Sequence, residues 1–168
     1  MSMNRSLVEL SPAALHELPL VLNLWKEAGQ WLNGKGISQW DVEALRLEDV
    51  LDYYHNDQSE IFIARYEGDI AGSLVVLWSD PAVWSDLDDG QAGYIHKLVI
   101  NRAYAAQGIG KELLELAGEY IADRGRNAIR LDCMEKNKRL NSYYKELNFK
   151  FIRCKESWGI NLYEKALR

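Results

Sequence analysis

The segment that runs from Leu98 to Leu114 constrains the fold more than any other part of this chain. A β-rich run from Tyr94 to Ile100 passes through a turn of small residues into a helix with one apolar stripe. Glycines at positions 108 and 110 mark the turn. The first amides of a helix lack acceptors within the helix and its dipole favours anions, so this turn predicts a phosphate site. A plain strand-to-helix turn would use the same glycines, and that alternative stays open.

Two better-known phosphate motifs fit this turn poorly. A P-loop is excluded because an alanine stands where its first glycine is required and Glu112 replaces the hydroxyl that would hold magnesium. A dinucleotide-binding fingerprint would require glycine at Leu113, yet Asp132 lies near the expected position of a ribose-binding acid. An enzyme with a dinucleotide cofactor therefore stays open as an alternative.

The whole chain alternates helical and extended patterns and predicts an α/β fold of the α+β kind. Glu67-Gly68-Asp69 separates two β-rich runs and indicates a hairpin. Ser11-Pro12 suits the start of a helix, as a cap residue followed by proline. We expect helices over residues 13–28, 47–54, 108–121 and 138–147, and strands over residues 61–66, 70–78, 94–100, 128–133, 149–156 and 158–167.

Composition narrows the class of protein. A chain of 168 residues with 48% hydrophobic and 27% charged residues suits one globular domain spanning 1–168. A net charge of −5 argues against nucleic acid as a partner. No apolar run suits a membrane span, and two isolated cysteines indicate a reducing compartment and no metal site. These features predict a cytoplasmic protein that acts on a small molecule, with a homodimer left open.

A second motif begins at Asn137, which can cap a helix with apolar residues at 140, 143, 144 and 147. Seven residues make nearly two turns, so Asn137 and Tyr144 share a face and lie roughly 10 Å apart along the axis. An extended ligand beside this helix would meet both. We expect Tyr143 to point about 100° away from that face. We expect Asn148 to end the helix in a left-handed conformation.

Together these segments resemble, in order and spacing, the acetyl-CoA-binding core of the GNAT acetyltransferase superfamily. The resemblance covers residues 93–152 and rests on Tyr94-Ile-His-Lys-Leu-Val-Ile100, Gln-Gly-Ile-Gly110, Arg130-Leu-Asp-Cys133, Asn137, Tyr143-Tyr144 and Asn-Phe149. It implies a mixed, mostly antiparallel sheet of six to seven strands flanked by helices, with one strand splayed from its neighbour. Two positions depart from the family pattern, Ala105 in place of arginine or glutamine and Asn148 in place of glycine.

The resemblance implies acetyl-CoA as the cosubstrate, with its pantetheine along the splayed strand and its pyrophosphate at the glycine turn. Because the expected phosphate contacts are mainly backbone N–H groups, Ala105 removes a side chain and leaves those contacts in place. The residues implied for cofactor binding are Leu98, Val99, Ile100, Gln107, Gly108, Ile109, Gly110, Lys111, Asn137 and Tyr144.

The resemblance also assigns chemical roles. Tyr144 matches the tyrosine that protonates the departing thiolate, a transfer uphill by about 2 kcal/mol at ordinary pKa values. The alternative is a core aromatic. His96 is expected to share a strand face with Leu98 and Ile100 and to act as general base. Its ordinary pKa lies about 4 units below that of an alkylammonium, so a non-catalytic histidine is the alternative. Cys133 is interpreted as a buried, inert thiol.

The acceptor side carries weaker signals. Four aspartates in one loop, at 80, 86, 88 and 89, would attract a cation or form a solvated acidic loop. Three tryptophans near the start of the chain could form the wall of an acceptor pocket or pack in the core. Three basic residues could contact the CoA phosphates or be ordinary surface charges. These residues are Trp25, Trp31, Trp40, Lys136, Lys138 and Arg139.

We therefore expect an N-acetyltransferase that moves an acetyl group from acetyl-CoA to a primary amine of a small molecule. The transfer is expected to be direct, in a ternary complex, and to use no metal. A non-catalytic acyl-CoA-binding or regulatory module is the alternative from another class of protein.

Overall fold

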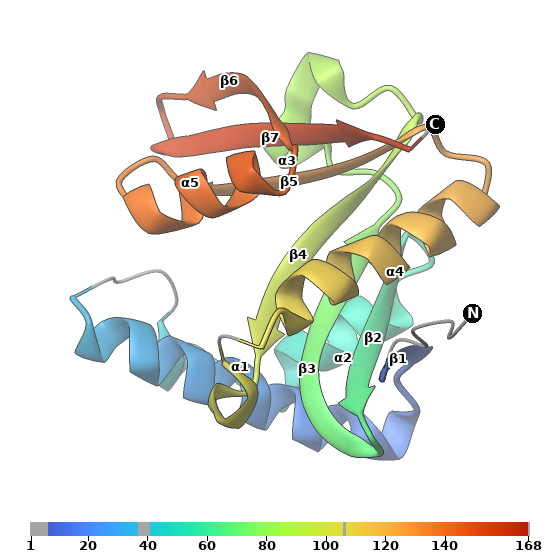
Figure 1. The fold of residues 1–168 in the computed structure, drawn as a ribbon, viewed down its shortest axis with the longest axis vertical. Helices are drawn as coiled ribbons and strands as arrows, with labels where there is room; N and C mark the ends of the chain where they lie inside the picture. Colours follow the sequence, from blue (N-terminus) through green and yellow to red (C-terminus); the bar gives the residue numbers. More distant parts are fainter. Residues whose placement is uncertain (1–6, 37–40, 106, 168) are drawn as a thin grey trace, which may run out of the picture.

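The computed structural model describes residues 7–36, 41–105 and 107–167, which form a seven-stranded sheet in the order β1-β2-β3-β4-β5-β7-β6 (Figure 1). Neighbouring strands are antiparallel except β4 and β5, which are parallel. The expected mixed sheet is confirmed, and a doubly wound dinucleotide fold is excluded because it needs a mostly parallel sheet. The strands are β1 Val8–Pro12, β2 Ser59–Tyr66, β3 Asp69–Leu77, β4 Ala92–Ile100, β5 Ala128–Met134, β6 Lys150–Lys155 and β7 Ile160–Ala166.

Helices cover both faces of the sheet, and each face has its own core. On the α4 face, α4 and α5 pack over a core that includes Leu113, Leu131 and Cys133. On the α1 face, α1 and α2 cover a second core around Trp25 and Val75. The α-helices are α1 Leu18–Gly34, α2 Leu47–His55, α3 Pro81–Trp84, α4 Ile109–Asp123 and α5 Lys138–Glu146. The 3₁₀ turns are η1 Leu15–Glu17, η2 Val42–Ala44, η3 Ser85–Leu87 and η4 Arg102–Tyr104.

The parallel strands β4 and β5 separate partway along their length. Their ladder begins with Ala92 opposite Ala128 and ends with Ile95 opposite Leu131, although both strands continue beyond these residues. Figure 1 shows β4 diverging from β5 and leading toward the start of α4. The splayed strand that the resemblance implies is therefore β4, and the opening lies after its fourth paired residue.

A β-bulge in β4 changes which face its side chains meet. Val75 of β3 lies opposite His96, whereas Ser73, two residues away, lies opposite Val99, so β4 carries one extra residue. Lys97 within the bulge has a φ of 51°, in the left-handed region. His96 thus shares the α1 face with Val75, while Leu98 and Ile100 pack on the α4 face. The expectation that these three residues share a face is wrong, because the extra residue shifts the alternation.

The first expected helix also starts elsewhere. Val8–Pro12 is an edge strand paired with β2, and α1 begins six residues after Pro12 and ends at Gly34. Proline lacks a backbone donor and is tolerated in an edge strand, which explains why Ser11-Pro12 does not open a helix here. The other turn signals are confirmed: Glu67 and Gly68 both have positive φ in the β2–β3 hairpin, and Asn148 ends α5 at a φ of 70°.

The bulge predicts an intolerant site at Gly72, opposite Ile100. A Cβ at Gly72 would lie 2.5 Å from the backbone oxygen of Val99, so Gly72→Ala should destabilise the fold by about 1–3 kcal/mol. Gly34→Ala is the matched control, because a Cβ there meets nothing within 4 Å. Urea unfolding of both variants gives the comparison, and equal midpoints would contradict the close approach of β3 to β4.

Candidate functional site

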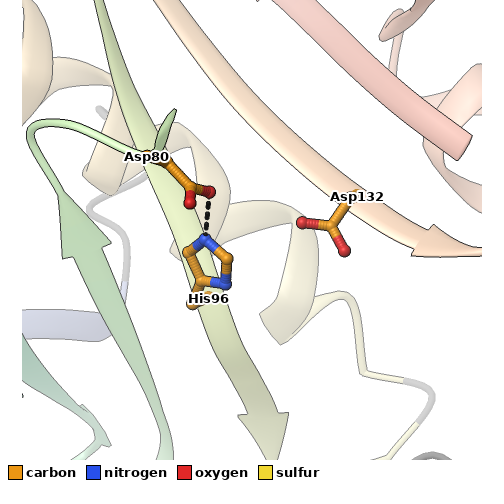
Figure 2. A group of neighbouring side chains, drawn as sticks. All are labelled: Asp80, His96 and Asp132. Carbon is orange, nitrogen blue, oxygen red and sulfur yellow. Dashed lines mark hydrogen bonds and ion pairs between the residues drawn. The ribbon is translucent and has the colours of Figure 1, made fainter. Parts of the chain in front are cut away.

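Three ionisable side chains meet where β4 and β5 separate (Figure 2). His96 comes from β4, Asp132 from β5 and Asp80 from the segment that enters α3. The Nε2 atom of His96 lies 2.7 Å from Oδ2 of Asp80, whose side chain is only 6% exposed. One ligand atom from each residue falls within 4.8 Å of the others. We call this group the acid–histidine cluster.

Burial disfavours the negative charge of one member of the cluster, Asp132. Burial raises the pKa of the Asp132 carboxyl; Asp80 adds to that shift, while His96 and Lys97 oppose it. Among the described residues no side chain or amide donates a hydrogen bond to Asp132. Asp80 by contrast holds the imidazole of His96 in one orientation, which leaves Nδ1 as the atom that can take a proton.

Imidazole and carboxylate are also metal ligands. Within the part of the chain that the structure describes, the acid–histidine cluster is the group of three whose atoms lie close enough for one ion to join them. The expectation of no metal is not tested by this geometry and stays a prediction.

Tyr144 lies on the opposite face of the sheet, in the core beneath α5. Its side chain packs against the rings of Tyr143, Phe149 and Tyr163, and the residue is 5% exposed. Burial strongly raises the pKa of its phenol, and no hydrogen bond to its hydroxyl exists among the described residues. The same core raises the pKa of the Cys133 thiol to about 12, chiefly by burial, so this cysteine carries no reactive thiolate at neutral pH.

A polar network that the sequence did not reveal anchors α5 to the sheet. Oδ1 of buried Asn141 accepts hydrogen bonds from the Tyr163 hydroxyl at 2.6 Å and from Asn161 at 2.9 Å, both in β7. Asn137 caps the helix, as expected, by accepting the amide of Leu140 at 3.1 Å. The only sequence signal for Asn141 was a polar residue beside the apolar stripe. The network ties α5, the helix that carries Tyr144, to β7.

The glycine turn opens α4 beside α5. Gly108 has a φ of 74°, and a Cβ there would meet nothing within 4 Å. A Cβ on Gly110 would lie 2.7 Å from the hydroxyl of Tyr143. Tyr143 therefore faces the glycine turn, and the expectation that it points away from the ligand face stays a prediction. Gln107 and Lys111 are exposed at the same turn.

The β4 residues implied for pantetheine lie beyond the last residue that pairs with β5. Leu98 and Ile100 pack on the α4 core and Val99 on the α1 core, and on the β5 side no ladder pair is formed in the described chain after Ile95. Their backbone is thus available to an extended ligand on that side.

Most aspartates of the acidic loop form hydrogen bonds that stabilise the fold. Three of its four aspartates bond to side chains elsewhere in the protein, and only Asp80 reaches the cluster. The three pairs are Asp86 with Arg153 at 3.0 Å, Asp88 with Tyr94 at 2.9 Å and Asp89 with Arg130 at 2.9 Å.

A hollow of about 590 Å³ opens on the α1 face, and we call it the α1–α2 pocket. Its aromatic and charged lining comprises Trp25, Tyr53, Lys97, Asp41, Asp49 and Asp52. Trp25 is 0% exposed, so it belongs to the core beneath this pocket. Trp31 stacks on the guanidinium of Arg102, 3.8 Å from its ring centre, and Trp40 lies outside the described residues. Lys136, Lys138 and Arg139 are exposed at the start of α5.

A mixed sheet parted between two parallel strands, with a glycine turn opening the next helix, is the arrangement of an acyl-CoA-dependent acyltransferase. The model of the Acetyltransferase (GNAT) family matches residues 25–149, and the chain belongs to that family. It is an acetyl-CoA-dependent acyltransferase, and the expectation of an N-acetyltransferase fold and activity is confirmed.

Two curated relatives are similar over most of their length. The N-acetyltransferase YesJ of Bacillus subtilis is 26% identical over 162 residues, covering 93% of this chain and 88% of the relative. The thialysine N-epsilon-acetyltransferase of Bos taurus is 26% identical over 155 residues, with 88% of each chain covered.

Solved structures agree on the fold. A GNAT acetyltransferase from Listeria monocytogenes superposes with a TM-score of 0.80 at 25% identity, covering 95% of this chain and 94% of that one. RimL, a ribosomal L7/L12 alpha-N-protein acetyltransferase in complex with coenzyme A, superposes with a TM-score of 0.70 at 18% identity, covering 95% and 93%. No helix in the described ranges is both long and apolar enough to cross a membrane.

The raised pKa of Asp132 predicts that replacing its carboxyl by a neutral amide stabilises the fold, and that this stabilisation depends on pH. Ionisation of the buried carboxyl destabilises the folded state at neutral pH, and this cost disappears below the unfolded pKa near 3.9. Asp132→Asn should therefore raise Tm by a few degrees at pH 7, with the gain shrinking as the pH falls toward 4. Asp123→Asn, at an exposed position on α4, should leave Tm unchanged at both pH values. A gain for Asp132→Asn that is independent of pH would rule out the buried charge as its cause.

Proposed function

We propose that the protein acetylates a primary amine of a small molecule by direct transfer within a ternary complex. The observation that carries this proposal is the opening between β4 and β5, where the acid–histidine cluster lies; Tyr144 belongs to the core on the opposite face of the sheet. A donor from one face and an acceptor from the other would meet in this opening.

The donor side fits acetyl-CoA. The unpaired edge of β4 at Leu98, Val99 and Ile100 would pair with the pantetheine amides, and the turn from Gln107 to Lys111 would hold the pyrophosphate. An αL glycine at 108 and the lack of a side chain at 110 support this, because phosphate must approach the backbone amides of a helix start closely. Asn137 and Tyr144 would complete the site along α5.

A small acceptor fits the α1 side. The α1–α2 pocket, at about 590 Å³, has the size of a small-molecule site. The name of the bovine relative gives the ε-nitrogen of thialysine as its acceptor, a side-chain amine of a small amino acid. RimL is named for a protein amine, but the pocket here supports a compact ligand.

The proposed reaction is balanced by two proton transfers. The amine nitrogen attacks the thioester carbonyl carbon, the N–C bond forms and the C–S bond breaks. Nδ1 of His96 takes the proton that the amine loses, and Asp80 on Nε2 stabilises the imidazolium. Tyr144 gives its proton to the leaving thiolate, so the products are the N-acetylated amine and CoA with a free thiol.

Burial acts on Tyr144 in two ways. The raised pKa keeps the phenol protonated and ready to donate at neutral pH, but it also makes the tyrosinate costly. The leaving thiolate would be desolvated by the same apolar side chains, which raises the pKa of the CoA thiol as well. Both shifts act in the same direction, which limits the increase in the mismatch between the two groups.

Replacing Tyr144 by phenylalanine keeps the ring and removes the proton. Tyr144→Phe should lower kcat about 10²-fold, a typical loss for a general acid, with little change in the dissociation constant of acetyl-CoA. Thiol release under saturating acetyl-CoA and amine measures the turnover, and calorimetry measures the affinity.

Tyr66→Phe is the control, because Tyr66 lies on β2, away from the opening. Tyr143 is unsuitable, since its hydroxyl faces the glycine turn. Equal kcat values for Tyr144→Phe and Tyr66→Phe would leave Tyr144 with a packing role only.

A further inference from the structure

We infer that the hydroxyl of Tyr143 binds CoA directly, by donating a hydrogen bond to the pyrophosphate at the glycine turn. This inference rests on the proposed function, because it takes the turn from Gln107 to Lys111 to hold that pyrophosphate. The family resemblance implies backbone N–H groups for this contact, so Tyr143 adds a side-chain donor to a site otherwise built from backbone.

The Tyr143 hydroxyl lies over the first turn of α4. A Cβ added to Gly110 would be 2.7 Å from this hydroxyl oxygen, 3.7 Å from the ring carbon that carries it and 3.9 Å from Cγ1 of Ile100. The glycine therefore leaves the space that the hydroxyl occupies. Packing of α5 beside α4 thus brings a phenol to a helix start, where the amides and the helix dipole favour an anion.

This hydroxyl has no hydrogen-bond partner within the part of the chain that the structure describes. Three other tyrosine hydroxyls, those of Tyr94, Tyr120 and Tyr163, bond to side chains at 2.9, 2.7 and 2.6 Å. A tyrosine hydroxyl in buried surroundings usually has such a partner, because its desolvation is otherwise uncompensated. The unused donor of Tyr143 therefore points to a ligand that supplies the acceptor.

The ring of Tyr143 is held by packing, whereas its hydroxyl is not explained by packing. The residue is half-buried against the core of the α4 face, and its ring centre lies 5.8 Å from that of Tyr144. Phenylalanine would make the same apolar contacts. Burial raises the pKa of the Tyr143 phenol, so the hydroxyl is protonated at neutral pH and can donate to a phosphate oxygen.

The two adjacent tyrosines would serve two ends of one extended ligand. Successive residues of a helix point about 100° apart, so Tyr143 and Tyr144 meet different parts of that ligand. In the proposed function Tyr144 lies at the thiol end of CoA, and Tyr143, which faces Gly110, lies at the pyrophosphate end. Lys111 is exposed at the same turn and adds a positive charge that favours the anion.

The experiment measures binding by calorimetry with two probes, CoA and dephospho-CoA, which lacks the 3′-phosphate but keeps the pyrophosphate. Tyr143→Phe should raise the Kd of both probes by about 10-fold, the typical loss for one hydrogen bond to a charged group. Tyr66→Phe is the matched control, because it removes a hydroxyl on β2, away from the turn, and its Kd values should equal those of the parent.

A second measurement, made without ligand, tests the close approach of the hydroxyl to Gly110. Gly110→Ala should lower the urea midpoint more in the parent than in the Tyr143→Phe background. The reason is that removing the hydroxyl leaves the ring carbon, at 3.7 Å, as the nearest atom of that side chain. An equal change in both backgrounds would contradict the placement of the hydroxyl, and the inference with it.

The outcomes separate this inference from the proposed function. Unchanged Kd values for Tyr143→Phe would overturn the inference and leave CoA binding at the turn intact. A loss seen with CoA but not with dephospho-CoA would also overturn it, because the hydroxyl would then contact the 3′-phosphate. If the parent binds neither probe, the donor side of the proposed function fails and this inference fails with it.

Discussion

The separation of β4 from β5 after Ile95 and Leu131 is the constraint on which the rest of the site depends. A continuous sheet would bury the next residues of both strands, His96 and Asp132, between layers of apolar side chains. A buried carboxylate and imidazole at that position would be costly. The opening removes the backbone pairing at this point and leaves the charged groups at its α1 side, with the apolar core and Tyr144 at its α4 side. In the proposed function, donor and acceptor would then approach from different faces.

Ion pairs around the opening hold the loop that supplies Asp80. Arg130, only 7% exposed, bonds to Asp89 of this loop, to the Tyr94 hydroxyl of β4 and to Glu164 of β7. Its stacked position over the Trp84 ring, 5.1 Å from the ring centre, adds a contact with α3. Breaking such a buried network leaves polar groups without partners, so its members act as a unit. The network thus ties the position of Asp80, and through it the orientation of His96, to the sheet itself.

Local signals in the sequence predicted the elements that depend on neighbouring residues. The hairpin at Glu67-Gly68, the capped helix at Asn137 and its left-handed end at Asn148 follow from rules that act over a few residues. The family resemblance added the splayed strand, which no periodicity contains. The bulge at Lys97 was not visible, because Tyr94 to Ile100 is one β-rich run in which no glycine or other turn residue marks an extra position. Its existence depends on how β3 pairs with β4, a contact between distant segments.

The α1–α2 pocket was anticipated only in part, since Trp25 was given as a pocket wall or a core residue while the aspartates of the lining were not singled out. Sequence reasoning assigned a cation to the aspartates nearest the strand, but Arg130, Arg153 and Tyr94 occupy three of them. Aspartates on and before α2 line the pocket instead, because the packing of α1 against α2 brings them beside Trp25 and Lys97. The edge strand before α1 was not predicted either, because Ser11-Pro12 indicated the start of a helix, whereas Pro12 pairs with β2. In each case tertiary contacts overrode a local preference.

In the proposed mechanism, donor and acceptor occupy the opening together, from opposite faces, and no acyl group passes through Cys133. Initial rates measured at several fixed amine concentrations against varied acetyl-CoA test this most directly. Because a ternary complex forms before the transfer, the double-reciprocal lines should intersect. Parallel lines, together with an acetylated Cys133 in protein treated with acetyl-CoA alone, would contradict it.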